Sequence, residues 1–324
     1  MKKQIIALLL LALSAASCDI CQFNSRTSAG PARDDADRIS FTLDSPGTFG
    51  ATLLKTRATA ATAIASFKAA ATTGAAGTET TAWNNVTFTS DGADTPTFTG
   101  EKYWPYTDPG YHFYAVTVAE GAAAAPSLAF AAGGTSVTTD GTTDVVCAYL
   151  PYADGSFKVK NHLDFAHIYA RLSTVTVHAD AAYAISNVTV SLVNAKTGGT
   201  YNLRTGCGRT DGTGWSALTP ASAGDTQIYA HAGTIAAGGN HTGADNDLYI
   251  VPGTYSLKAT WTASWDDYTQ TFTGVTSTGT IDLAGGSVNA IACTLSGNAT
   301  ELVFSVTLSP WGSNSISGVT FPVL

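Results

Sequence analysis

Cys18 is the residue in this sequence with the clearest chemistry, because a thiol in its position can receive a lipid. Small residues occupy positions 14–17 directly before it, an apolar run fills residues 5–13, and two lysines follow the initial methionine. A basic start, a short apolar run and a small-residue cleavage site are typical of a secretory signal peptide. The run is shorter than the about 20 residues that a transmembrane helix needs. We expect cleavage between Ser17 and Cys18 and lipidation of Cys18; the alternative is an ordinary signal peptide with a chance cysteine.

Other side chains that could serve catalysis or metal binding are poorly placed for either. His162 and His167 are five residues apart, a spacing that fits one face of neither a strand nor a helix. Asp266 and Asp267 are adjacent, so on a strand they would point to opposite faces and could not flank one bond. Asp245-Asn246-Asp247 could offer oxygen ligands but lacks the glycine-containing loop of calcium sites. The sequence also has no phosphate-binding loop, zinc-protease motif or nucleophile elbow. We therefore expect no enzyme activity, no metal and no cofactor.

Three cysteines beyond the signal region are scattered along the chain. Cys147, Cys207 and Cys293 lack the C-x-x-C spacing of zinc sites. One pair could join in an oxidising compartment, but the spacing does not say which. Cys147 and Cys293 lie inside strand-like runs, so we expect both to be buried as small hydrophobic residues.

The composition indicates a folded, acidic chain. Of 324 residues, 44% are hydrophobic and only 12% are charged, and the formal net charge is −8. That apolar content is enough to fill cores and excludes a disordered chain. Lysine and arginine do not cluster, so we expect no binding to nucleic acid.

Apolar and polar residues alternate along much of the chain, as in strands with one buried face. The alternation is clear over 254–261 and recurs over 188–192 and 302–308, whereas 111–118 and 145–150 are apolar enough for central strands. Asp-Gly steps between the runs are tight-turn signals, and long helical periodicity is nearly absent. These features predict an all-β fold built from sandwiches of short strands.

The strand series divides best into two sandwiches in tandem, with a boundary near residues 154–161. After the signal peptide at 1–17, residues 18–38 read as a tether between the membrane and the first strand. We expect an N-terminal β-sandwich domain over 39–157 and a C-terminal one over 158–324.

The two ends of the folded body share one pattern, in which three alternate side chains on a predicted strand are apolar. These residues are Ile39, Phe41 and Leu43 near the start, and Val319, Phe321 and Val323 near the end. An added strand is recognised through backbone bonds and pockets for alternate side chains. The terminal segment of one copy could therefore fill a groove that the first strand of another copy has vacated. The alternative is coincidence between two edge strands, and Pro322 limits pairing because it has no backbone donor.

Vacating such a groove requires a cut after the first strand, and Arg57 is placed for one. Arg57 precedes Ala58 in a stretch of small polar residues that follows the predicted strand at 39–43. Proteolysis concentrates in loops of this kind. Cleavage at any of the three earlier arginines would leave the strand attached. We expect an arginine-specific protease to cut between Arg57 and Ala58.

Short motifs spread in order over most of the chain are similar to those of a known family. They are Cys18 after its signal, Thr56-Arg57-Ala58, Tyr103-Trp104-Pro105 before residues 111–115, the run from Leu163 to Leu172, and the closing Leu308-Ser309-Pro310-Trp311. Together they resemble the fimbrillin family, the lipoprotein-derived subunits of type V pili in Bacteroidota, including its minor-fimbrium-like members. The resemblance implies two transthyretin-like β-sandwich domains, delivery to the outer membrane, trimming by an arginine-specific protease and polymerisation by strand exchange.

Carried over by position, the resemblance makes Arg57 the processing site, 39–43 the removed strand and 319–323 the donor strand. The segment after Trp311 is shorter than the family pattern, which leaves stalk, tip and anchor roles open. We expect a lipoprotein precursor at the cell outer membrane that becomes a structural subunit of a surface fimbrium. Its partners would be further copies of itself or related pilus subunits, the membrane through the lipid, the protease, and a host glycan or protein receptor. The rivals are a tip adhesin and a monomeric glycan-binding surface lipoprotein.

Overall fold

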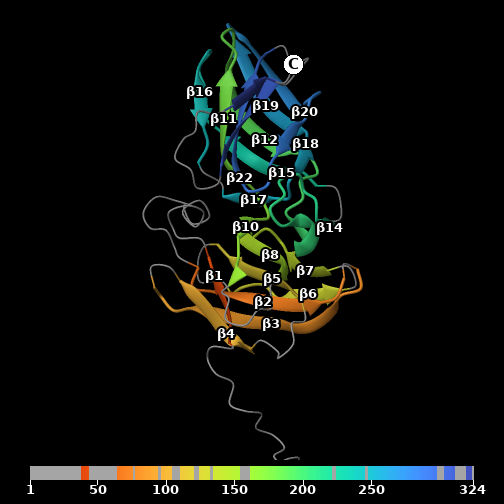
Figure 1. Ribbon diagram of the computed structural model, residues 1–324. Helices are drawn as coiled ribbons and strands as arrows, with labels where there is room; N and C mark the ends of the chain where they lie inside the picture. The colour runs from red at the N-terminus through yellow and green to blue at the C-terminus, as the bar shows by residue number, and fades with distance from the viewer. Residues whose placement is uncertain are drawn as a thin grey trace, which may run out of the picture.

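A computed structural model describes most of the chain from Arg38 to Pro322 (Figure 1). The described residues are 38–43, 64–75, 77–93, 96–103, 110–119, 124–131, 134–153, 161–220, 224–244, 247–297, 303–310 and 319–322. Nearly all their regular structure is β-strand, which confirms the all-β prediction. Within this part of the chain no helix has the length and apolar character needed to cross a membrane.

Eight strands form a sheet in the N-terminal half, drawn low in Figure 1. They are β1 (Arg38–Thr42), β2 (Ser66–Thr73), β3 (Thr80–Ser90), β4 (Thr97–Tyr103), β5 (Tyr111–Val118), β8 (Val145–Ala153), β9 (Asn161–His162) and β10 (Ala166–His167). Their spatial order is β10-β8-β5-β2-β3-β4-β1-β9. β5 is covered on both faces, because Phe113 and Ala115 enter one core cluster while Tyr114 and Val116 enter another. Burial on both faces explains the continuous apolar run that predicted a central strand here.

A smaller four-stranded sheet connects the two halves of the chain. Its strands are β6 (Leu128–Ala131), β7 (Gly134–Thr139), β13 (Gly198–Asn202) and β14 (Trp215–Thr219), in the order β14-β13-β7-β6. The short helix α3 (Leu203–Gly206) follows β13 directly. It begins where the Asn202 side chain accepts hydrogen bonds from the backbone N–H groups of Arg204 and Thr205, as an N-cap does.

Two sheets pack face to face in the C-terminal half, drawn high in Figure 1. One contains β11 (Ala170–Ala179), β16 (Asn240–Thr242), β17 (Leu248–Ile250), β22 (Ser287–Leu295), β23 (Val303–Pro310) and β24 (Val319–Pro322). The other contains β12 (Ala184–Leu192), β15 (Thr226–His231), β19 (Leu257–Trp265) and β20 (Tyr268–Thr276), and β18 (Gly253–Tyr255) pairs separately with β21 (Ile281–Leu283). Alternate residues of β11, β12, β19 and β22 fill the core between the sheets. Cys293 and Trp261 are buried in this core.

Hydrogen bonding crosses the boundary predicted at residue 157. β9 and β10 follow that boundary in the sequence, yet they pair with β1 and β8 of the first sheet. β13 likewise pairs with β7. The division into domains at 39–157 and 158–324 therefore stays a prediction, and the two parts share a sheet.

The sequence pattern treats Asp266 and Asp267 as strand residues, but neither lies on a strand. They form the turn between β19 and β20, where Asp266 has a φ of +47°. Tight hairpin turns need positive φ at a central residue, and aspartate tolerates it better than most side chains.

Candidate functional site

β1 occupies a slot between two other strands of the N-terminal sheet. It pairs antiparallel with β4, where Phe41 lies opposite Phe98, and parallel with the short β9. The backbone N–H of Leu163 donates to the Thr42 carbonyl at 3.0 Å and extends the pairing on the β9 side. β1 is thus an inserted strand whose removal would open the sheet between β4 and β9.

The side chains of β1 alternate between core and surface. Ile39 and Phe41 are completely buried, whereas Arg38, Ser40 and Thr42 are partly exposed. Fully burying one such apolar side chain stabilises a fold by about 1.5–3 kcal/mol. Two buried residues and the backbone pairing therefore make β1 an integral part of this core.

Phe41 is the central contact of the inserted strand. Its ring lies edge-on to Phe113 at 4.9 Å and to Phe88 at 5.0 Å between centroids, and Phe67 lies 5.9 Å away. Edge-to-face pairs of this kind add about 0.5–1.5 kcal/mol beyond area burial. Around these rings, the same cluster includes Phe98, Leu163 and Phe165, and Leu43 packs against it partly buried. If β1 left together with Leu43, the other residues of this cluster would line an apolar groove.

Polar contacts hold both ends of the inserted strand. The Arg38 guanidinium lies over the Tyr103 ring at 5.6 Å, and its Nη2 donates to the Tyr103 hydroxyl at 3.2 Å. At the other end, the Thr42 hydroxyl lies 3.5 Å from Nδ1 of His162. Nε2 of His162 is in turn 2.9 Å from a carboxylate oxygen of Asp164. These contacts are partly exposed, so they position β1 more than they stabilise it.

β24, the predicted donor strand, lies at the edge of the β16-β11-β22-β23-β24 sheet. Its backbone pairs antiparallel with β23, where Val319 lies opposite Leu308 and Phe321 opposite Val306. β24 is therefore an edge strand of its own copy, and edge strands are templates for pairing with other chains.

The predicted site residues divide into two groups. Ile39, Phe41 and Leu43 lie together in the N-terminal core, and the backbone of Val319 and Phe321 lies on the C-terminal sheet. The other positions fall outside the described residues: Ser17, Cys18, Arg57, Ala58 and Val323. The segment 44–63, which contains Arg57 and links β1 to β2, also falls outside.

Arg204 joins the helix α3 to the first sheet through a buried ion pair. Its guanidinium bonds the Glu79 carboxylate, whose side chain is fully buried, while 21% of the Arg204 side chain is exposed. The Tyr114 hydroxyl also donates to Glu79, at 3.3 Å. Burial raises the pKa of Tyr114 well above its usual value, so its proton is held firmly for this bond. This contact fixes the second half of the chain onto the sheet that carries β1.

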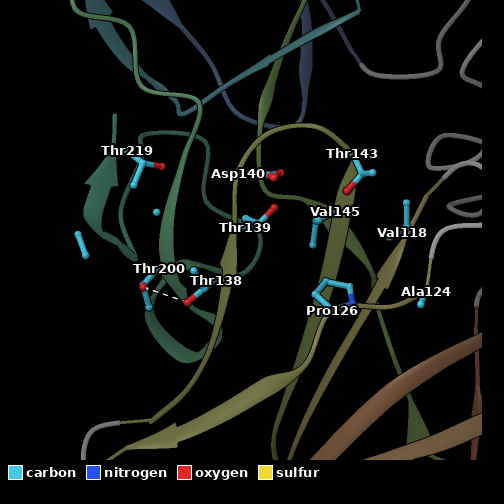
Figure 2. A pocket seen from close by; sticks show the side chains of 12 residues that line it. Val118, Ala124, Pro126, Thr138, Thr139, Asp140, Thr143, Val145, Thr200 and Thr219 are labelled. Carbon is cyan, nitrogen blue, oxygen red and sulfur yellow. Dashed lines mark hydrogen bonds between the residues drawn. The ribbon is translucent and has the colours of Figure 1, made fainter. Parts of the chain in front are cut away.

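A hollow of about 600 Å³ lies beside β7 and β13, and Figure 2 shows its lining. Five threonines contribute to the lining, and Thr138 and Thr200 face each other with 3.2 Å between their oxygens. Asp140 contributes a carboxylate whose pKa is lowered by hydrogen bonds, the largest effect coming from the Thr142 side chain. The lining contains neither histidine nor cysteine. Across the described ranges, no three His, Cys, Asp or Glu residues gather as a metal site would require.

The aromatic lining of the β1 slot was missed from the sequence. Phe67, Phe88 and Phe98 each stand within alternating runs, which predict strands but not which strands meet. The Glu79–Arg204 pair, separated by 125 residues, gave no signal at all.

This chain is similar to one known protein family and to several solved structures. A family model described as fimbrillin-like matches residues 51–311. A fimbrial protein from Bacteroides vulgatus ATCC 8482 is similar in structure with a TM-score of 0.53 and 17% identity, over 84% of this chain and 99% of that one. A proposed cell adhesion protein from Bacteroides uniformis ATCC 8492 gives a TM-score of 0.47 and 17% identity, over 86% of this chain and 100% of the other. A fimbrial assembly protein from Parabacteroides distasonis ATCC 8503 gives 0.35 and 9%, over 83% and 94%. A comparison with curated proteins found no match.

Proposed function

Because this chain belongs to the fimbrillin-like family, we propose that it is a structural pilus subunit that polymerises by exchanging β1 for the C-terminal strand of another copy. The family points to a non-enzymatic, pilus-related protein at the cell surface. The finer steps proposed are export as an outer-membrane lipoprotein through Cys18, trimming between Arg57 and Ala58, and strand exchange.

The observation that carries the proposal is the position of β1. A strand that starts the described chain sits between β4 and β9 with Ile39 and Phe41 completely buried. Only the segment 44–63 connects it to β2. A cut after Arg57 would leave β1 held by non-covalent contacts alone, so that a competing strand could replace it.

The C-terminal segment has the side chains to take that place. If Val319 and Phe321 occupied the positions of Ile39 and Phe41, a β-branched residue and a phenylalanine would enter the same core positions. Replacement by similar volumes costs little packing energy. Exchange is favoured because the incoming strand is covalently attached to a folded copy. The cleaved β1 peptide, by contrast, diffuses away once it is released.

Pro322 is compatible with this register. In a strand, the N–H and C=O groups of one residue point to the same side, and those of the next residue point to the opposite side. The Thr42 carbonyl faces the β9 side, where it accepts from Leu163, so the Thr42 N–H faces that side too. A proline in the place of Thr42 would lose pairing only toward the short β9 and would keep the ladder with β4.

Cutting the purified precursor with an arginine-specific protease tests the proposal. We expect a new N-terminus at Ala58 and concentration-dependent polymers in light scattering, both lost in Arg57→Ala and retained in Arg33→Ala. Phe321→Asp should block polymers after normal trimming, because it places a charge in an apolar groove. Thr320→Asp, which adds the same charge on the opposite face, is the matched control and should still polymerise. Trimmed protein that stays monomeric, or that polymerises equally with Phe321→Asp, would contradict strand exchange.

A glycan-binding role remains the second candidate because of the β19–β20 hairpin. Tyr268 is 69% exposed there and stacks on Trp265 with 6.2 Å between ring centroids. Trp265 is backed by Tyr183 in an edge-on contact at 5.4 Å, so the aromatic pair is held in place. Binding to a glycan array that Tyr268→Ala abolishes would support this role, while an unaffected or absent signal would remove it.

A further inference from the structure

Two cysteines from different halves of the chain meet inside one core cluster. Cys147 lies on β8 and is completely buried, and Cys207 directly follows α3 and packs against the same cluster. Both are free thiols in this structure, and the Cys207 side chain lies close enough to Cys147 to add to the effect of burial in raising the pKa of its thiol. We propose that Cys147 and Cys207 form a disulfide in the exported protein, joining the N-terminal sheet to the α3 segment.

The local backbone holds Cys207 toward Cys147. Its N–H donates to the Leu203 carbonyl at 3.1 Å and closes the turn of α3, which itself contacts β8. Gly206 lies so close to the Tyr201 ring that a β-carbon there would be 2.5 Å from it, so the chain passes tightly over this part of the core. The approach of the two thiols is therefore set by packed structure on both sides.

The third described cysteine is in a different place. Cys293 belongs to the core between the two C-terminal sheets, whereas Cys147 and Cys207 share the cluster around Tyr201. The structure thus selects one pair among the three that the sequence left open.

The bond forms by thiol–disulfide exchange with a donor disulfide, which acts as the oxidant in the compartment to which the protein is exported. The Cys207 thiolate attacks the donor disulfide and releases one donor thiolate, giving a mixed disulfide. The Cys147 thiolate then attacks the Cys207 sulfur and releases the second donor thiolate. Two electrons pass from the protein to the donor, and the protons lost by the two cysteines are taken up by the two thiolates released. Disulfides persist in such oxidising compartments.

Burial decides when this reaction takes place. Loss of water around Cys147 raises the pKa of its thiol well above the usual range, and contact with Cys207 adds to the effect. Because the thiolate is the attacking form, closure is slow once the core has formed and proceeds during folding. The same burial then protects the finished bond from external thiols.

Peptide mapping of the protein purified from the exported fraction tests the proposal. Free thiols are blocked with N-ethylmaleimide in denaturant, and the protein is digested with trypsin without reduction. Trypsin places Cys147 in residues 103–158, Cys207 in 205–209 and Cys293 in 259–324. We expect 205–209 to be found joined to 103–158, with the 259–324 peptide carrying the maleimide. Recovery of 205–209 carrying maleimide would overturn the proposal.

Thermal unfolding supplies an independent test. Reduction should lower the melting temperature of the wild type by about 5–10 °C, because the cross-link closes a long loop. Cys207→Ser should melt at the reduced value with or without reductant, and Cys293→Ser should keep the response to reductant. A wild type that melts identically in both conditions would contradict the bond. Pilus assembly plays no part in either measurement, so their outcome is separate from the fate of the proposed function.

Discussion

The Phe41 ring stands almost perpendicular to the Phe113 ring, at an angle of 89° and with 4.9 Å between centroids. Phe41 belongs to β1, the first described strand, and Phe113 belongs to β5 in the middle of the sheet. The proposed removable strand therefore reaches the centre of the N-terminal core. This contact accounts both for the stability of an uncut precursor and for the groove that trimming would expose.

Truncating Phe41 should destabilise the uncut precursor strongly. Phe41→Ala removes a fully buried ring and should lower the free energy of unfolding by about 3–5 kcal/mol. Urea denaturation followed by tryptophan fluorescence measures this loss. Ser40→Ala, on the outer face of the same strand, should change the free energy by less than about 0.5 kcal/mol. Equal effects of the two substitutions would show that β1 is not inserted in the core.

The Glu79–Arg204 pair should be necessary for the attachment of α3 to the sheet. Arg204→Met leaves the buried Glu79 carboxylate without its cation and should cost about 3–5 kcal/mol in urea denaturation. Adding Glu79→Gln to this variant should restore part of the loss, since no buried charge then remains. Arg209→Met is the control, because Arg209 and its partner Asp211 are both about half exposed. No measurable change is expected there, and a similar loss in both variants would contradict a specific role for the buried pair.

Sequence patterns predicted the strands better than their partners. The alternation over 188–192 and 254–261 reappears in β12, β18 and β19, because one face of each is buried against the sandwich core. The slot for β1 depends on β9, a strand too short to produce any periodic pattern. Likewise, pairing of β7 with β13 and of Glu79 with Arg204 joins residues far apart in the chain, and alternation carries no information about such contacts. Ile39 and Phe41 were predictable because they repeat a local pattern, whereas the rings that enclose them were not.

Alkaline pH should weaken the fold through Cys293 among other groups. Burial raises the pKa of its thiol from 9.0 to about 12. A folded-state pKa above the unfolded value means that the stabilisation is complete below about pH 9 and is lost as the pH rises toward 12. Over that window Cys293→Ala should lose about 1.4 kcal/mol less per pH unit than the wild type. Urea midpoints of both proteins at about pH 8, 9.5 and 11 measure the difference, because these values lie below the window, near its start and well inside it. A parallel decline of the two proteins would show that Cys293 does not contribute.

Gly141 should be irreplaceable where the two halves of the chain meet. A β-carbon on Gly141 would lie 2.0 Å from the Thr197 carbonyl oxygen, and its φ is +79°. Gly92 has a similar φ of +76° but open space around it, so Gly92→Ala isolates the cost of the backbone conformation. That cost should be about 1–2 kcal/mol in urea denaturation, and Gly141→Ala should exceed it clearly. Equal losses would mean that the close approach of residues 141 and 197 is absent in solution.

Cross-linking between copies tests strand exchange most directly. Ser40 lies opposite Thr99 in the β1–β4 pair. The Thr42 carbonyl points toward β9, so the backbone groups of Ser40, two residues earlier, point toward β9 as well. Ser40 and Thr99 therefore form a non-hydrogen-bonded pair, in which side chains lie closest together. If Phe321 replaces Phe41, Thr320 of one copy comes to lie opposite Thr99 of the next. The variant carrying Thr320→Cys and Thr99→Cys should give a ladder of disulfide-linked polymers on a non-reducing gel after cleavage at Arg57, and none before cleavage. The precursor with Ser40→Cys and Thr99→Cys should instead cross-link within one molecule. Cleaved Thr320→Cys/Thr99→Cys protein that forms no ladder, while the Ser40→Cys control does cross-link, would contradict the exchange of β1 for the C-terminal strand.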